Sequence, residues 1–516
     1  MNSKTILAAL KKHKSQRAAA KALGIPRTTF QEHLKKAQSV QFTEKKIAKP
    51  IVVKHKALPV QRFILTSAQD RTKVHMPFLN NLIAYAKHLD AQLLISGYTY
   101  SHALFTEYHD KNTSWYVDEV QPYLTNDHYE IGTHISFCGE MNIRPSATTP
   151  LSGLESYTRE RWGIFPHAKV QLKSLSTMKD SIAKIIMTTG TVTKPNYLRM
   201  KDGLKAQFHH VYGAVLVEIT EDGAFFCRHL LGNKKDGSFY DLNKLVKDET
   251  VTEGHSALAI TWGDIHIEKI DPEVASASFF ANDSLLNVLK PSYQFIHDLI
   301  DFKARNHHNI KDPHHMFEMW WNGEEVISDT IYEAADFLVG IERKGCQTVV
   351  VESNHDLALN KWLKTADYRD DPANAVFFLK SQLEVYQRIA EGSKDFSLLE
   401  CAIKASHKEV NATFLKQDDS FVIAKANGGI ECGMHGHLGM NGAKGSSRSF
   451  SKMGPKANMG HTHSAEIFDG IYTAGVTGSL DMGYNKGPSS WTHTHIVTYP
   501  NGKRALLTYN KGKFYA

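Results

Sequence analysis

Apolar side chains recur at helical spacing in residues 1–37, and this pattern predicts three short helices. Gly24 permits a tight turn before the third helix. Pro26 opens that helix at a position where its missing N–H costs no hydrogen bond. Phe30 and Leu34 form the inward stripe of the same helix. We therefore expect a small all-α head.

The pattern changes twice after this head. Residues 38–59 are rich in Lys, contain two prolines and show no sustained periodicity, so we expect a basic linker. Residues 60–253 alternate short β-type apolar runs with helical stretches, which predicts an α/β domain. Because this segment carries no recognisable motif, its role stays open, with self-association into a homo-oligomer as one option.

Residues 254–516 continue this alternation, so a second and larger α/β domain is expected. A strand-like run at 257–262 opens the domain, and a Gly-rich tract covers 428–460. The chain ends in two apolar runs separated by Asn501 and Gly502, a dipeptide typical of a two-residue hairpin turn.

Charge is distributed unevenly along the chain. The formal net charge is +7, yet residues 1–59 contain fourteen Lys or Arg against only Glu32 and Glu44. The remainder is therefore mildly acidic. A basic head on an acidic body is the electrostatic pattern of a nucleic-acid contact, with a solvated basic tail as the alternative.

Composition limits the class of protein. Hydrophobic residues make up 42% and charged residues 22%, which is typical of a globular chain. The five cysteines lack CxxC spacing, which argues against a disulfide framework or a zinc ribbon. No apolar run approaches the ~20 residues of a membrane span, and the N-terminus lacks the apolar core of a signal peptide. We expect no membrane contact and a cytoplasmic location, in the host cytoplasm if a phage encodes the chain.

Five short segments of the second α/β domain carry side chains that bind metals, and most of them follow a predicted strand. Loops leaving strand ends meet at one edge of a sheet, so dispersed ligands can share one site. Carboxylate, amide and imidazole donors favour manganese, iron or zinc over an all-thiolate site. The segments supply, in chain order, Asp264 and His266, Asp298, Asn354 with His355 and Asp356, His435, and His461 with His463.

This order resembles the calcineurin-like metallophosphoesterase superfamily over about residues 258–479, with its D-x-H, G-D-x-x-D, G-N-H-D/E, H and G-H-x-H segments. The resemblance implies a four-layer α/β/β/α sandwich and two divalent ions, manganese first, with iron, zinc or magnesium as alternatives. His355 would be the general acid, and Asp356 would steer it. The implied metal ligands are Asp264, His266 and His463 for one ion, Asn354, His435 and His461 for the other, and Asp298 between them.

Two positions depart from the superfamily pattern. His297 and Ser353 stand where it has glycines, and lost glycines put local backbone geometry in doubt. Single D-x-H or H-x-H matches are weak in a chain with 28 histidines, and the pair His493 and His495 is expected to be a decoy. The alternatives are surface side chains that imitate the pattern, or a relative that has lost its metals.

The head resembles the Fis-type helix-turn-helix, whose GIxRTTxxxxLK pattern covers residues 24–35. In such a module the second helix of the pair enters the major groove, while basic side chains nearby contact phosphates. A dimerisation or docking module is the alternative. The implied DNA contacts are Arg17, Lys21, Arg27, Thr28, Gln31 and Lys35.

The leading hypothesis is a metal-dependent DNA nuclease, similar to the double-strand-break repair nucleases of the superfamily and, in its combination of parts, to nucleases of tailed phages. DNA is the expected partner. A protein or small-molecule phosphatase localised by its head shares the same ligands and stays open. A third hypothesis is a non-catalytic DNA-binding assembly protein whose metals are structural.

Overall fold

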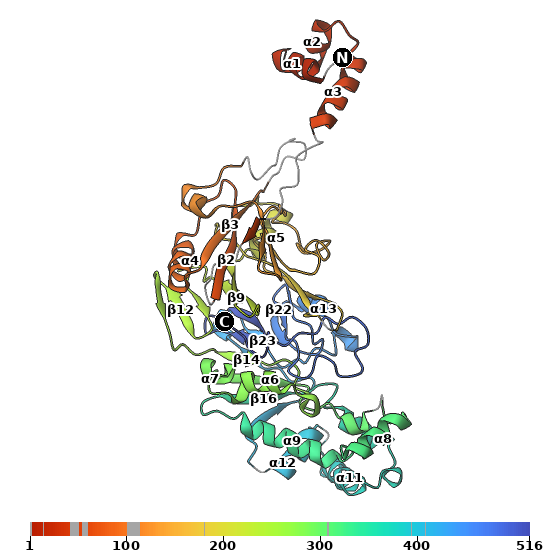
Figure 1. Ribbon diagram of the computed structural model, residues 1–516. Helices are drawn as coiled ribbons and strands as arrows, with labels where there is room; N and C mark the ends of the chain where they lie inside the picture. The colour runs from red at the N-terminus through yellow and green to blue at the C-terminus, as the bar shows by residue number, and fades with distance from the viewer. Residues whose placement is uncertain are drawn as a thin grey trace. The chain divides into compact units, whose positions relative to one another are not determined.

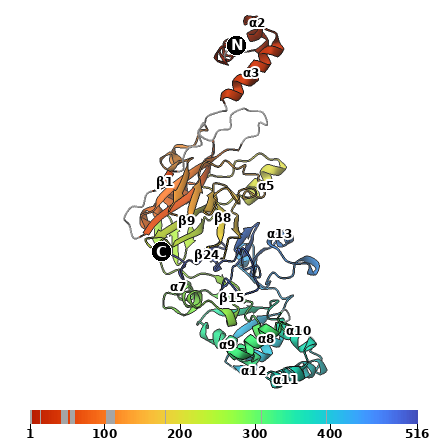
Figure 2. The same cartoon turned by 45° about the vertical axis from the view of Figure 1, so that its right-hand side comes forward.

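The computed structural model falls into two compact units, residues 1–51 and 52–516 (Figures 1 and 2). The described residues are 3–13, 15–41, 51–53, 60–100, 114–179, 181–306, 309–393, 395–407 and 409–516.

The first unit contains three helices, α1 (Ser3–His13), α2 (Gln16–Ala22) and α3 (Arg27–Gln41). Gly24 has φ +65°, which fits the tight turn expected before the third helix. The helices enclose a small core that includes Phe30 and Leu34, the two residues predicted to face inward. The all-α character of the head is confirmed.

The second unit is built around a six-stranded sheet in the order β17-β16-β15-β14-β23-β24. Its first four strands are parallel, whereas β23 pairs antiparallel with both of its neighbours. Gly502, with φ +73°, lies between β23 and β24, as the predicted hairpin requires. The strands are β14 (Ala259–Thr261), β15 (Tyr293–His297), β16 (Gln347–Val351), β17 (Ala412–Leu415), β23 (Thr494–Thr498) and β24 (Arg504–Thr508).

Alternate residues of these strands face opposite sides. Ile260 and Ile296 pack among helices, whereas Ala259 and Phe295 pack against a second sheet. This is the period of two that places successive side chains on opposite faces. The helices of this part are α6 (Pro272–Ala275), α7 (Leu285–Leu289), α8 (Pro313–Asn322), α9 (Ile327–Gly340), α10 (Ala358–Thr365), α11 (Ala375–Ala390) and α12 (Leu398–Ser406).

The second sheet has eleven strands in the order β1-β4-β5-β6-β8-β7-β21-β22-β20-β19-β18. It joins strands from both predicted α/β domains, because β7 pairs with β21. The strands are β1 (Ile51–Val53), β4 (His128–Ile131), β5 (Ile135–Cys138), β6 (Trp162–Phe165), β7 (Leu172–Leu175), β8 (Lys184–Thr188), β18 (Val422–Ile423), β19 (Ile430–Glu431), β20 (Lys456–Met459), β21 (Glu466–Phe468) and β22 (Ile471–Thr473).

Residues 60–253 and 254–516 therefore share one sheet within one compact unit, and the boundary expected at 253 does not divide it. Helices, the six-stranded sheet and the second sheet form three layers. The short α13 (Ser447–Phe450) contacts β21 and β22 of the second sheet. The expected four-layer metallophosphoesterase sandwich stays a prediction.

A four-stranded sheet in the order β10-β9-β2-β3 completes the main body, with a small sheet of β11, β12 and β13 beside it. Helix α4 (Met76–Leu89) packs on β2 and β3, as the α/β pattern predicts, and α5 (Lys201–His209) precedes β9. No helix among the described residues is long and apolar enough to cross a bilayer. The strands are β2 (Val60–Gln69), β3 (Gln92–Tyr98), β9 (Gly213–Thr220), β10 (Phe225–Leu231), β11 (Phe239–Asp241), β12 (Lys244–Lys247) and β13 (Thr250–Thr252).

Candidate metal centre

Three neighbouring parallel strands deliver side chains to one edge of the six-stranded sheet. Asp264 and His266 follow β14, Asp298 follows β15 directly, and Asn354 follows β16. Because the carboxyl ends of parallel strands meet at one edge, residues far apart in sequence come together there. The prediction that these segments converge is confirmed for all three strands.

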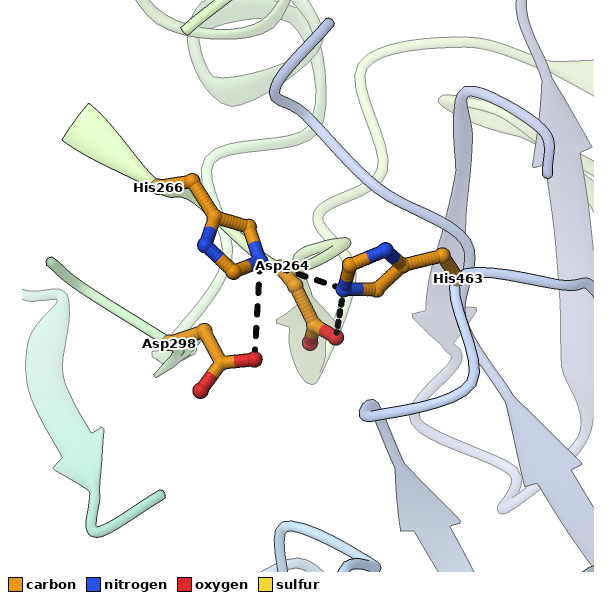
Figure 3. Close-up of side chains that lie close together, drawn as sticks. All are labelled: Asp264, His266, Asp298 and His463. Atoms are coloured by element: carbon orange, nitrogen blue, oxygen red, sulfur yellow. Dashed lines mark hydrogen bonds and ion pairs between the residues drawn. The ribbon is translucent and has the colours of Figure 1, made fainter. Parts of the chain in front are cut away.

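Four buried side chains form the first part of the centre (Figure 3). One ligand atom from each of Asp264, His266, Asp298 and His463 lies within 4.8 Å of the others. His463 Nε2 is 3.1 Å from both Asp264 Oδ2 and His266 Nε2, and His266 Nε2 is 3.5 Å from Asp298 Oδ2. Two carboxylates and two imidazoles thus point at one small volume.

A second group meets the other side of Asp298. His435 Nε2 lies 3.4 Å from Asp298 Oδ2 and 3.1 Å from the amide oxygen of Asn354. The ring of His461 is close to that of His435, with centroids 5.2 Å apart. Asp298 therefore contacts both groups, which is the position expected of a bridging ligand.

The donor set fits divalent cations better than a closed hydrogen-bond network. Both carboxylate oxygens of Asp298 and Oδ1 of Asp264 are buried, and within the described part of the chain they accept no hydrogen bond. Buried charges left in this way are costly unless a counter-charge compensates them. Burial and the neighbouring Asp298 raise the pKa of Asp264. Positive charge between the carboxylates would offset this repulsion.

The imidazoles are held in the form that binds metals. Burial lowers the pKa of both His461 and His463 to about 4, and it lowers the pKa of His435 well below its usual value. A neutral imidazole keeps a lone pair for a cation, whereas an imidazolium does not. These histidines are therefore neutral donors at neutral pH.

The backbone around the ligands is unusual. His266, Asp298, His461 and His463 all have positive φ, at 48°, 43°, 75° and 56°. Non-glycine residues rarely adopt this conformation, and such strain concentrates at functional sites. A Cβ atom on Gly460 would lie 2.1 Å from Asp264 Oδ1, so the centre requires glycine there.

His355 lies beside the first group, but its carboxylate partner differs from the expected one. Its Nδ1 is 3.3 Å from Asp301 Oδ1, and Asp301 also lies 3.2 Å from Nδ1 of His266. Asp356 instead accepts hydrogen bonds from the Ser353 hydroxyl and the Ile300 N–H. Asp301 rather than Asp356 therefore contacts His355, because the Asp356 carboxylate is turned toward Ser353 and the backbone of Ile300.

Burial lowers the pKa of His355, but the carboxylates of Asp298 and Asp301 raise it more, to about 10. The imidazole therefore carries a proton at neutral pH. Lys269 Nζ lies 2.7 Å from Asp301 Oδ2 and supports the same carboxylate.

Sequence reasoning gave no role to Asp301 or Lys269, and it missed three rings around the centre. Trp491 packs on His463 with centroids 4.2 Å apart, and Tyr484 stacks near His355 at 6.2 Å. His437 lies 5.4 Å from His435. The D-x-x-D spacing was a signal for Asp301, whereas nothing local marked the aromatic rings.

The two positions where the superfamily has glycine do not adopt a positive φ in this chain. His297 and Ser353 both have ordinary φ, and the left-handed residue is Asp298 itself. His297 is buried with its Nδ1 3.4 Å from Nδ1 of His435, so it lies behind a ligand. His495 accepts the Gly263 N–H at 2.9 Å, which agrees with its interpretation as a decoy.

In the head, the basic and polar residues expected to contact DNA are mainly at the surface. Arg17, Lys21, Arg27 and Thr28 are exposed. Gln31 is half-buried and donates a hydrogen bond to Gln16 Oε1 at 3.2 Å. The side chain of Lys35 lies outside the described residues.

Comparison with known proteins places this chain among phage proteins. It is 42% identical over 468 residues to Protein A1 of Escherichia phage T5, a match that covers 88% of this chain and 83% of that protein. The chain belongs to the Protein A1 family. No family model and no solved structure matches it. The expected phage origin agrees with this Protein A1 relative.

Proposed function

We propose that the protein is a two-metal phosphodiesterase of the calcineurin-like type, and that its substrate is DNA. The observation that carries the proposal is the position of Asp298, whose buried Oδ2 lies 3.5 Å from His266 Nε2 in one group of donors and 3.4 Å from His435 Nε2 in the other. A bridging carboxylate with carboxylate and imidazole donors on one side and imidazole and amide donors on the other suits manganese, iron or zinc. The layered arrangement of helices and two sheets supports a metallophosphoesterase sandwich.

Each group of donors has a defined task. The ligands assigned to the first ion are Asp264, His266 and His463, and those assigned to the second are Asn354, His435 and His461, with Asp298 shared. Two divalent ions held there would neutralise phosphate oxygens and lower the pKa of an attacking water. The first group gathers its ligand atoms within 4.8 Å of one another, a spacing that one ion can span.

His355 is the proposed general acid. It is protonated at neutral pH, and its ring lies 4.7 Å from that of His266, at the margin of the first group. Asp301 holds Nδ1 of this imidazole, which leaves Nε2 to give its proton to the leaving oxygen. Lys269 keeps Asp301 charged and in place.

The head supports DNA as the substrate. Fourteen basic residues against two acidic ones in residues 1–59 suit a polyanion. Exposed Arg17, Lys21 and Arg27 are available for phosphates, and the helix-turn-helix assignment places α3 in the major groove. The phage relative is consistent with a nuclease that acts in the host cytoplasm.

The test uses the purified full chain with manganese. Linear, circular and single-stranded DNA are compared with bis-p-nitrophenyl phosphate, a diester, and p-nitrophenyl phosphate, a monoester. We expect cleavage of DNA and of the diester, and loss of both in Asp264→Asn and His355→Ala. Cleavage of the monoester alone would make the protein a phosphatase.

The head is tested by removing residues 1–59. DNA binding should weaken and lose much of its salt dependence, because phosphate contacts release counterions. Hydrolysis of the small diester should stay unchanged, since the proposed metal ligands all lie in the second unit. An unchanged salt slope for DNA would identify the head as a protein-docking module.

A further inference from the structure

Helix α11 exposes an apolar stripe along its length. Val376, Leu379, Leu383, Tyr386 and Ile389 have exposed fractions of 67%, 48%, 58%, 67% and 50%. Their spacing of three and four positions places them on one face of the helix. Spacing of this kind is the pattern by which helices pair with one another.

The opposite face of α11 is firmly packed. Phe378 is buried and meets Trp362 with ring centroids 4.8 Å apart, and Ser381 is also buried. The Gln382 side chain donates to the carbonyl of Leu363. The helix is therefore held by its buried face, and the apolar stripe on its other face is exposed.

Helix α8 adds a second apolar cluster at the same end of the unit (Figures 1 and 2). Phe317, Trp320 and Trp321 are 57%, 57% and 72% exposed, and their ring centroids lie 5.7–6.3 Å apart. Asn374, just before α11, donates to the carbonyl of Glu325, just after α8. The loop that follows α8 is thus tied to the start of α11.

The two clusters together expose an apolar area close to one partner's share of a protein interface. With about 200 Å² for a whole aromatic side chain and about 100 Å² for an aliphatic one, the eight side chains expose on the order of 700 Å². The largest apolar patch on a typical monomer is about 300–600 Å². A partner in a standard protein interface contributes about 800 Å².

Charge distinguishes the possible occupants. The three charged residues of α11 are Lys380, Glu384 and Arg388, and the last two pair with each other at 2.6 Å. The net charge of α11 is therefore +1, which is too small to attract DNA or an anionic lipid surface strongly, or to repel an identical face.

We propose that α11 and α8 form the interface between two copies of this chain. A two-fold axis brings the same stripe from each copy together, as an isologous dimer requires. This proposal does not depend on the metal centre. It also places self-association on these helices, whereas the sequence analysis considered residues 60–253.

The test is the mass of the full chain in solution by light scattering over a series of concentrations. We expect twice the 58.0 kDa of one chain at micromolar concentration. Leu383→Glu combined with Tyr386→Glu should raise the dissociation constant of the dimer at least about tenfold, because carboxylates would be buried in the interface. Trp321→Glu should act in the same direction.

Phe208→Glu is the matched control, because Phe208 is 80% exposed on α5 and lies outside the proposed interface. It should leave the dimer intact, and circular dichroism should report equal helix content in all variants. A monomeric wild type, or a dimer that survives the α11 double variant, would overturn the proposal. So would a monomer that binds phosphatidylcholine vesicles through these residues.

Discussion

Two clusters of buried charge among the described residues of the second unit differ in how fully their carboxylates are paired. Arg228 pairs with Asp241 and with Glu218, at 2.5 Å each, and Tyr85 donates to Asp241 at 2.6 Å. Arg62 meets the other oxygen of Glu218 at 2.9 Å. Every carboxylate oxygen of this cluster has a partner, so the cluster is a structural network.

The candidate metal centre is equally buried, but its carboxylates are not all paired. Asp264 and Asp298 lie close together, and three of their four carboxylate oxygens accept no hydrogen bond from the described residues. Under the proposed function, these unsatisfied oxygens bind cations, whereas the complete network only stabilises the fold.

The largest expected effect is loss of hydrolysis in Asp264→Asn. The rate should fall on the order of 10³-fold, because a metal ligand is lost. Stability of the metal-free protein should stay equal or rise, since burial and Asp298 disfavour the charged form of Asp264. Activity assays and urea unfolding in EDTA measure both effects, with Asp283→Asn, an exposed site, as the control. A large loss of metal-free stability would place Asp264 in the structural class.

In the complete network around Arg228, a substitution is expected to lower stability and to leave metal binding unchanged. Arg228→Met should cost about 3–5 kcal/mol of unfolding free energy, because it leaves two buried carboxylates unpaired. Manganese binding per folded chain should stay unchanged. Urea unfolding and elemental analysis check the two statements. A cost below 1 kcal/mol would remove the contrast between the clusters.

Metal should stabilise the wild-type fold. A ligand at a hundred times its dissociation constant adds about 2.7 kcal/mol when it binds only the folded state. The melting temperature should therefore rise when manganese replaces EDTA. The rise should vanish in Asp298→Asn and persist in Arg228→Met. Equal shifts in wild type and Asp298→Asn would indicate binding elsewhere.

The smallest expected effect is the difference in hydrolysis rate between variants of Asp301 and of Asp356. Asp301→Asn should lower hydrolysis about 10–100-fold, as loss of a group that orients a catalytic histidine does. It should also alter the pH dependence of the rate, because Asp301 raises the pKa of His355. Asp356→Asn should change the rate less, since its carboxylate serves Ser353 and Ile300. The reverse order would restore the role expected from the sequence.

The sequence predicted the parts of the centre that depend on local order. Asp264, Asp298 and Asn354 follow strands, and the rule that parallel strand ends meet is sufficient to bring them together. The partner of His355 was not predictable in this way. Asp301 and Asp356 are both near it in sequence or space, and side-chain rotamers set by packing decide which one makes the contact.

The fold was predicted less completely for a similar reason. The alternation of apolar runs predicted the α/β character of residues 60–253 and the final hairpin, because both patterns are regular along the chain. The pairing of β7 with β21 joins residues nearly three hundred positions apart. No local pattern specifies such a pairing, so the shared sheet was missed and a domain boundary was expected in its place.

The most direct test is anomalous diffraction at the manganese edge from crystals of the full chain grown with manganese. Two peaks about 3.5–4 Å apart are expected, one on each side of the Asp298 carboxylate. The absence of any peak at Asp298, or peaks confined to the protein surface, would contradict it.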